Sequence, residues 1–183
     1  INTTSLSSDV GVSRTTLNEW LSVLEASFVV FRLPSWFDNA NKRAIKTPKL
    51  YFTETGLAAW LLEIETPKQI SRDPLLGNLF ENMVVVEALK TRLNAGLMQN
   101  LYFYRDPKGN EVDLILRQHR QLRPVEIKAA MTFSPEMTKG INHFRKQRVD
   151  SVPGAVVYAG DIETESEMTH ILNFYNTSEL FAS

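Results

Sequence analysis

Two segments in which apolar and charged residues alternate constrain the fold most strongly. Residues 111–117 read Glu-Val-Asp-Leu-Ile-Leu-Arg, and residues 124–130 read Pro-Val-Glu-Ile-Lys-Ala-Ala. Because the side chains of a strand alternate between its two faces, Val112 and Leu114 should point to one face and Asp113 to the other. Both segments are therefore predicted to be β-strands.

The second segment carries two charged groups on a single face. Glu126 and Lys128 are separated by one residue and point the same way, whereas Val125 and Ile127 point the opposite way. If the two strands are neighbours, Asp113, Glu126 and Lys128 meet on one face of the sheet. A divalent-metal site requires such a convergence of carboxylates.

A long apolar helix before these strands contains an acidic residue. The segment from 75 to about 93 is apolar over most of its surface, which predicts a buried helix. Glu81 shares a face with Val84 and Ala88, so its carboxylate should project into a poorly solvated region. A buried carboxylate needs a partner, which is a cation, a metal ion or a hydrogen-bond donor.

The first part of the chain, residues 1–65, has the pattern of a winged helix-turn-helix. Gly11 suits a left-handed turn between two helices, and Ser13 is a good N-cap for the second helix. The predicted elements are helices at 5–10 and 14–26, strands at 28–33 and 49–52 and a closing helix at 55–62. A stretch with turn signals, residues 63–73, connects this predicted domain to a second one at residues 72–183.

Residue types that contact phosphates and base edges lie on the second helix and on the tip of the predicted hairpin. We expect DNA contact from Arg14, Thr15, Thr16, Asn18, Lys42, Arg43 and Lys46. Because acidic residues nearly balance the basic ones in this part, docking on the rest of the chain or on a partner is the alternative role.

The second part is predicted to be a mixed α/β domain. Its expected elements are strands at 101–105, 111–117, 124–130 and 154–160, a helix from 134 to about 148, and a strand or helix at 169–175. The apolar composition of residues 154–160 favours a central strand. Basic residues, among them Arg105, Arg145 and Lys146, are expected to line a groove for a DNA backbone.

Composition sets wider limits. A chain of 183 residues with 43% hydrophobic content can bury a core, and its net charge of −1 restricts nucleic-acid contact to local basic patches. The absence of cysteine excludes disulfides and thiolate metal sites and fits a cytoplasmic protein. His119, His143 and His170 are too scattered for a zinc site. No apolar run approaches the roughly 18–20 residues that span a bilayer, so no membrane partner is expected.

The order of these elements and charged residues resembles the PD-(D/E)XK nuclease superfamily, whose fold is that of restriction endonucleases. The residues that carry the resemblance are Gly77, Phe80-Glu81, Tyr104-Arg105, Glu111-Val112-Asp113 and Val125-Glu126-Ile127-Lys128. The whole chain also resembles the C-terminal region of a prokaryotic family of AAA-type ATPases. There a winged helix with the segment KLYFTETGLAAWLL, here residues 49–62, precedes a nuclease-like domain designated DUF4143.

The resemblance implies hydrolysis of DNA phosphodiester bonds with Mg²⁺ or Mn²⁺. Asp113, Glu126 and the backbone carbonyl of Ile127 would hold the metal ion, and Glu81 would complete its shell or orient a bound water. Lys128 would position or activate the attacking water and offset developing negative charge. The chemistry is consistent, because hard cations prefer oxygen ligands and a nearby ammonium group stabilises an anionic transition state.

The chain also differs from the nuclease pattern. Val112 stands where the literal motif has proline, and no GxxxxGK[ST] motif occurs. ATP would therefore bind only to an ATPase domain upstream of Ile1, and the start without Met leads us to expect part of a longer protein. The alternatives are a non-catalytic DNA-binding or regulatory module and a protein-interaction module that controls the upstream ATPase or its assembly, a homo-oligomer included.

Overall fold

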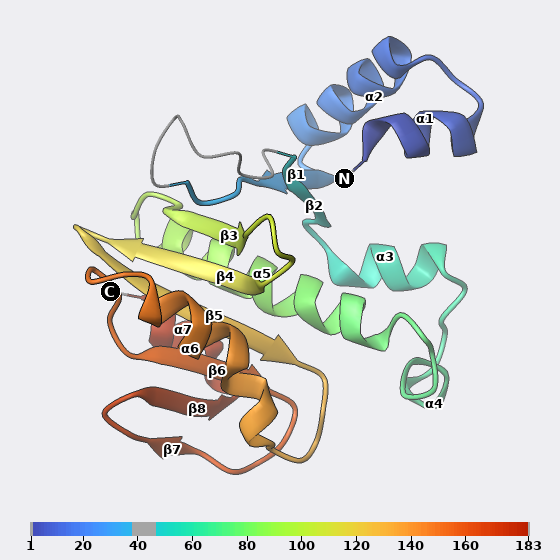
Figure 1. The fold of residues 1–183 in the computed structure, drawn as a ribbon. Helices are drawn as coiled ribbons and strands as arrows, with labels where there is room; N and C mark the ends of the chain where they lie inside the picture. The colour runs from blue at the N-terminus through green and yellow to red at the C-terminus, as the bar shows by residue number, and fades with distance from the viewer. Residues whose placement is uncertain (1, 38–46, 183) are drawn as a thin grey trace.

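A six-stranded mixed sheet organises the second half of the protein (Figure 1). The computed structural model describes residues 2–37 and 47–182. The strands are β3 (Leu101–Arg105), β4 (Glu111–Gln118), β5 (Gln121–Lys128), β6 (Gly154–Tyr158), β7 (Thr164–Glu165) and β8 (Thr169–Asn173). Their order across the sheet is β3-β4-β5-β6-β8-β7. The pairs β5·β6 and β6·β8 are parallel, and the other pairs are antiparallel.

This sheet confirms the predicted mixed α/β class. Strand β6 is buried along its whole length between β5 and β8, as the apolar composition of residues 154–160 indicated. The sequence left residues 169–175 open between strand and helix. The structure resolves them as β8, followed by the short 3-10 helix η2 (Phe174–Asn176).

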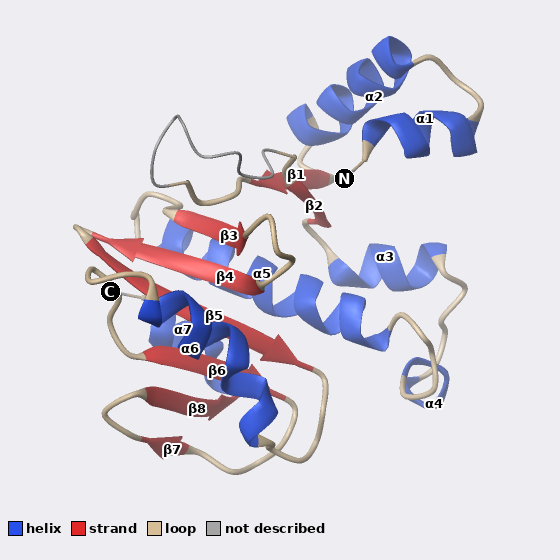
Figure 2. Cartoon of the chain, in the orientation of Figure 1, coloured by secondary structure: helices blue, strands red, loops and turns tan. Residues whose placement is uncertain are grey.

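Helices cover both faces of the sheet (Figure 2). They are α5 (Leu76–Asn94), the 3-10 turn η1 (Pro135–Thr138), α6 (Lys139–Lys146) and α7 (Thr177–Phe181). Helices α5 and α7 pack on one face, where Val85 and Phe181 share a core with Ile127. Helix α6 packs on the other face, where Phe144 contacts the core around Ile115. The predicted buried helix is confirmed, and it places Glu81 beside the sheet.

One detail of the strand prediction is wrong. Val112 lies on the face covered by α6, whereas Leu114 lies on the face covered by α5. The register between β3 and β4 shifts between Tyr102 and Tyr104. An irregularity of this kind places an extra residue in one strand and reverses the alternation of side chains. Asp113 therefore lies where β4 changes face.

The first part of the chain contains two helices joined by a turn, followed by a two-stranded hairpin. The elements are α1 (Thr3–Val10), α2 (Arg14–Ala26), β1 (Val30–Leu33), β2 (Lys49–Phe52), α3 (Thr55–Leu61) and α4 (Pro67–Ile70). Gly11 adopts the left-handed conformation with φ 75°, and the Ser13 side chain accepts a hydrogen bond from the backbone N–H of Thr16 at 3.1 Å. Strand β1 begins later than predicted, because Phe28 has a positive φ of 57°.

The hairpin and the second half share one core. Leu33 and Tyr51 belong to the same buried cluster as the apolar side chains of α5. Asn82 of α5 fixes the contact, since its side chain accepts from the backbone N–H of Phe52 and donates to the Phe52 carbonyl, both at 2.9 Å. Strand β2 is therefore held against α5, close to Glu81.

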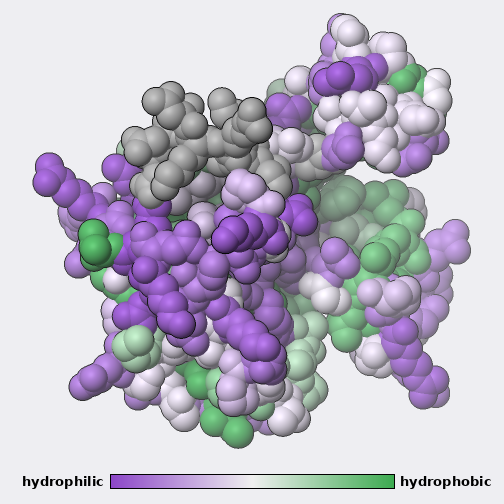
Figure 3. Space-filling model, viewed as in Figure 1, coloured by the Kyte–Doolittle hydropathy of each residue, from purple (hydrophilic) through white to green (hydrophobic). Residues whose placement is uncertain are grey.

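The surface is unevenly polar. Apolar side chains gather over α3 and the start of α5, where Leu61, Leu62 and Leu75 are exposed (Figure 3). Within the described residues, no helix combines the length and apolar character needed to cross a bilayer.

Candidate functional site

Two neighbouring strands bring three of the predicted site residues into contact. The Lys128 Nζ of β5 lies 2.9 Å from Asp113 Oδ2 of β4 and 2.5 Å from Glu126 Oε2. The backbone N–H of Ile127 also donates to Asp113 Oδ2 at 2.9 Å. The two carboxylates thus converge on one ammonium group, and we refer to Asp113, Glu126 and Lys128 as the carboxylate–lysine cluster.

The protonation of the cluster is set by burial and by its internal charges. Burial, reinforced by the negative charge of Asp113, raises the pKa of Glu126 from 4.5 to about 8. Burial acts on Asp113 in the same sense, but Lys128 and the Ile127 N–H outweigh it, and the pKa of Asp113 falls below its usual value. The two carboxylates raise the pKa of Lys128 despite its burial. At neutral pH, Asp113 and Lys128 are charged and Glu126 largely holds a proton.

Glu126 occupies its position because α6 has a glycine beside it. A Cβ at Gly140 would overlap with Glu126 Oε1 and would lie 2.6 Å from the backbone oxygen of Glu111. Only a residue without a side chain lets α6 approach β4 and β5 this closely. Sequence reasoning missed Gly140, and a single sequence gives little signal for it, since the close approach is a tertiary contact.

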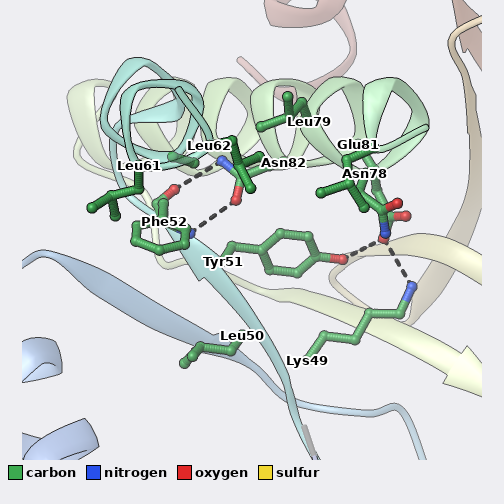
Figure 4. A pocket seen from close by; sticks show the side chains of 12 residues that line it. Lys49, Leu50, Tyr51, Phe52, Leu61, Leu62, Asn78, Leu79, Glu81 and Asn82 are labelled. Atoms are coloured by element: carbon green, nitrogen blue, oxygen red, sulfur yellow. Dashed lines mark hydrogen bonds and ion pairs between the residues drawn. The ribbon is translucent and has the colours of Figure 1, made fainter. Parts of the chain in front are cut away.

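The fourth predicted residue, Glu81, has different partners. Its Oε1 accepts hydrogen bonds from Lys49 Nζ at 2.9 Å and from the Tyr51 hydroxyl at 2.5 Å (Figure 4). Lys49 also pairs with Glu111 at 2.8 Å. The partly buried Glu81 carboxylate, 22% exposed, is therefore satisfied by a cation and a hydrogen-bond donor, two of the partners that the sequence left open.

These partners also shift the titration of the groups around Glu81. Burial acts to lower the pKa of Lys49, but the charges of Glu81 and Glu111 outweigh it and raise the pKa. Burial and the negative charge of Glu81 together raise the pKa of the Tyr51 hydroxyl, so that it stays a hydrogen-bond donor. The charge of Lys49 in turn helps to lower the pKa of Asp113, which couples this group to the carboxylate–lysine cluster.

Lys49 and Tyr51 were not predicted as site residues. From the sequence, Lys49 was expected only as the first residue of the strand at 49–52. A usable signal was present, because Lys49 and Tyr51 lie two apart in a strand and so share a face. They form the polar end of a cavity of about 570 Å³ between β2, α3 and α5 that is otherwise mostly apolar (Figure 4).

The predicted metal ligands match a hard cation in type, since carboxylates and a backbone carbonyl are oxygen donors. In the part of the chain that the structure describes, however, no group of three or more Asp, Glu or His side chains is arranged to hold a metal ion. The reason is visible in the contacts. Lys128 lies between Asp113 and Glu126, and Lys49 pairs with Glu81. A metal ion would need Lys128 to withdraw from at least one carboxylate.

The predicted DNA-binding residues are distributed over several elements. Arg14, Thr15 and Asn18 are exposed on α2, and Thr16 supports the helix cap through a contact of 2.9 Å with Ser13. Those on the second half are Arg105 at the end of β3 and Arg145 and Lys146 on α6. Arg14 and Arg105 line a common cavity. The predicted residues Lys42, Arg43 and Lys46 lie outside the described residues.

The fold and this cluster define a mixed α/β protein with a carboxylate–lysine group on its sheet. Residues 76–177 match DUF4143, a domain of unknown function that is often found at the C-terminus of AAA-type ATPases, and the chain belongs to this family. Residues 1–68 match DUF8612, also a domain of unknown function.

Two curated relatives cover both regions. The uncharacterized proteins Mb2031c of Mycobacterium bovis and Rv2008c of Mycobacterium tuberculosis are each 31% identical to the chain over 159 residues. The alignment covers 85% of this chain and 34% of each relative, so the chain spans about a third of their length. No solved structure matches the chain.

Proposed function

We propose that the protein is a metal-dependent nuclease of the PD-(D/E)XK type that hydrolyses DNA phosphodiester bonds with Mg²⁺ or Mn²⁺. The observation that supports it best is the carboxylate–lysine cluster, in which Asp113 and Glu126 from neighbouring strands converge on Lys128 Nζ. The first part of the chain would act as a winged helix that docks DNA. ATP would act only through an upstream ATPase domain of the longer protein.

The proposed roles follow from charge and position. Asp113, Glu126 and the Ile127 carbonyl would hold the metal ion, which would supply Lewis acidity to the phosphate and to a bound water. Glu126 would lose its proton when the cation binds, because ligands must be deprotonated. Lys128 would turn from the carboxylates toward the phosphate and stabilise its developing negative charge. Glu81, held by Lys49 and Tyr51, would orient the attacking water.

The test compares cleavage of linear and single-stranded DNA by wild type, Lys128→Ala and Asp113→Ala/Lys128→Ala, with Mg²⁺ or Mn²⁺. Lys128→Ala should abolish cleavage at unchanged DNA affinity. Lys68→Ala is the matched control, since it removes an exposed lysine of α4 and should leave cleavage intact. Cleavage by the double variant at the wild-type rate would refute the assignment.

A second candidate function is a non-catalytic DNA-binding, regulatory or protein-interaction module of an ATPase. The ion pairs support it, because Lys128 and Lys49 already pair with the carboxylates around them. In that case the cluster is a structural ion network. Removing Lys128 alone would then lower the free energy of unfolding, by less than the roughly 3–5 kcal/mol of a fully buried pair because its side chain is 35% exposed, and wild type would show no metal-dependent cleavage.

A further inference from the structure

A polar cavity of about 430 Å³ lies beside the candidate site and outside the carboxylate–lysine cluster. The starts of α1 and α2 form one wall, and the start of β2 and the facing ends of β3 and β4 form the other. Thr3 and Thr4 of α1 line the same cavity as Arg105 and Glu111, which places the start of α1 near the sheet. We call this cavity the cationic cleft.

Three basic side chains from three different elements line the cationic cleft. They are Arg14 of α2, Lys49 of β2 and Arg105 of β3, and they face a single carboxylate, Glu111. Glu111 is shared, since it lies 2.8 Å from Lys49 Nζ and 3.6 Å from Arg105 Nε. Lys49 is also paired with Glu81 at 2.9 Å, so three cations are opposed by two carboxylates and the cleft keeps a surplus of one positive charge.

Among the three basic side chains of the cleft, Arg14 has the fewest ionic contacts. Its side chain is exposed and forms no ion pair with any residue that the structure describes. The planar guanidinium groups of Arg14 and Arg105 present several N–H donors in a fork that matches phosphate oxygens. The hydroxyl groups of Thr3 and Thr4 add neutral donors at the same wall.

The cationic cleft shares Lys49 with the group around Glu81. Lys49 and Glu111 line the cleft, and Lys49 also pairs with Glu81. Glu111 lies two residues before Asp113 on β4, roughly 7 Å along an extended strand. Successive phosphates of one nucleic-acid strand are separated by a comparable distance. A strand held in the cleft would therefore present its next phosphates toward Asp113 and Lys128.

We propose that the cationic cleft binds the phosphate groups of a nucleic-acid strand through Arg14 and Arg105. Binding stands independently of catalysis. Delivery of the strand to the carboxylate–lysine cluster rests on the proposed nuclease function. The ligand chemistry is a phosphodiester, which a single strand and a duplex both provide, and the two sources are separate arms of the test.

The test uses fluorescence anisotropy with a labelled single-stranded DNA oligonucleotide and with its duplex, in EDTA so that no cleavage occurs. Arg14→Gln/Arg105→Gln should weaken binding of at least one of them about tenfold or more, because each arginine loses a charged hydrogen bond to phosphate. The dependence of log K on log salt should also become shallower, by roughly 1.4 for two contacts to a single strand.

A matched control exists in a second cavity of about 470 Å³ near α4. Lys68 and Arg72 line it together with Glu63 and Asp73, so its charges balance. Lys68→Gln/Arg72→Gln removes the same charge and should leave affinity and salt dependence close to wild type. Equal losses of DNA affinity in both double variants would refute the proposal that the cationic cleft binds phosphate, since they would indicate a non-specific attraction between DNA and any positive charge on the protein. Unchanged affinity in Arg14→Gln/Arg105→Gln would overturn it as well.

Failure of the cleft and failure of the nuclease are distinguishable. Cleavage by wild type together with full affinity in Arg14→Gln/Arg105→Gln would refute the cleft and leave the nuclease standing. Loss of binding in that variant without cleavage by wild type would establish the cleft and refute the nuclease. Circular dichroism of both double variants checks that they are folded.

Discussion

Replacing Gly140 by alanine should destabilise the protein, although the same exchange inside a helix normally stabilises it. Gly140 lies in the first turn of α6, and a new Cβ would overlap with Glu126 Oε1 and lie 2.6 Å from the backbone oxygen of Glu111. The Glu126 side chain can move only by leaving Lys128, and the Glu111 carbonyl is fixed in β4. Neither the Glu126 side chain nor the Glu111 carbonyl can therefore move away from the new Cβ without a cost in stability.

The expected change in the free energy of unfolding of Gly140→Ala is the sum of two opposing contributions. Exchange of glycine for alanine in a helix contributes up to about 1 kcal/mol of stability. An extra methyl group in a closely packed position costs about 1–3 kcal/mol. We therefore expect the free energy of unfolding of Gly140→Ala to fall by about 1–2 kcal/mol. For a chain of this length the melting temperature would fall by roughly 2–8 °C.

Urea and thermal unfolding followed by circular dichroism measure this loss. Gly77→Ala in α5 is the control, because nothing lies within 4 Å of its Cβ and the helix-propensity gain should remain. The two variants should therefore shift stability in opposite directions. The close approach of α6 to Glu126 would be refuted if Gly140→Ala were as stable as Gly77→Ala.

Three further outcomes test the site and its support. Burial raises the pKa of Glu126 to about 8, so the folded state keeps a proton that the unfolded state releases, and stability is lost as pH rises from about 4.5 through about 8. Glu126→Gln should therefore gain stability relative to wild type with rising pH, on the order of 5 kcal/mol at most above pH 8, and a pH-independent difference in urea unfolding would contradict this. Asn82→Ala leaves the backbone groups of Phe52 unpaired and should cost about 2–4 kcal/mol in the same assay, whereas a loss below about 0.5 kcal/mol would show that Asn82 does not hold β2 on α5. Calorimetric titration with Mn²⁺ should give heat of binding for wild type and little for Asp113→Asn, and identical isotherms would exclude Asp113 as a ligand.

Strand periodicity predicted correctly the side-chain contacts that depend on residues close together in one strand or in neighbouring strands. Glu126 and Lys128 share a face because they lie two apart in one strand, and β4 is the direct neighbour of β5. The change of face between Val112 and Leu114 was not predictable, since it arises from the register of β4 against β3. Alternation in a single segment carries no information about its partner strand.

The partners of Glu81 could not be predicted from the sequence for a similar reason. A carboxylate on an apolar helix can be recognised from the sequence, and its need for a partner follows from the cost of desolvating a charge. Lys49 and Tyr51, however, lie about thirty residues earlier, in the hairpin. Only the packing of β2 against α5 brings them to Glu81. The sequence therefore predicted that Glu81 needs a partner but did not identify the partner.

The charges of the two groups also decide which residues can bind a phosphate. Lys49 is held by Glu81 and Glu111, so a phosphate could recruit it only by breaking two ion pairs in a half-buried position. Arg105 has one longer contact, to Glu111, and Arg14 has no ionic partner among the described residues. Releasing these two arginines costs little. Affinity in the cationic cleft should therefore come from Arg14 and Arg105, while Lys49 keeps Glu81 in place.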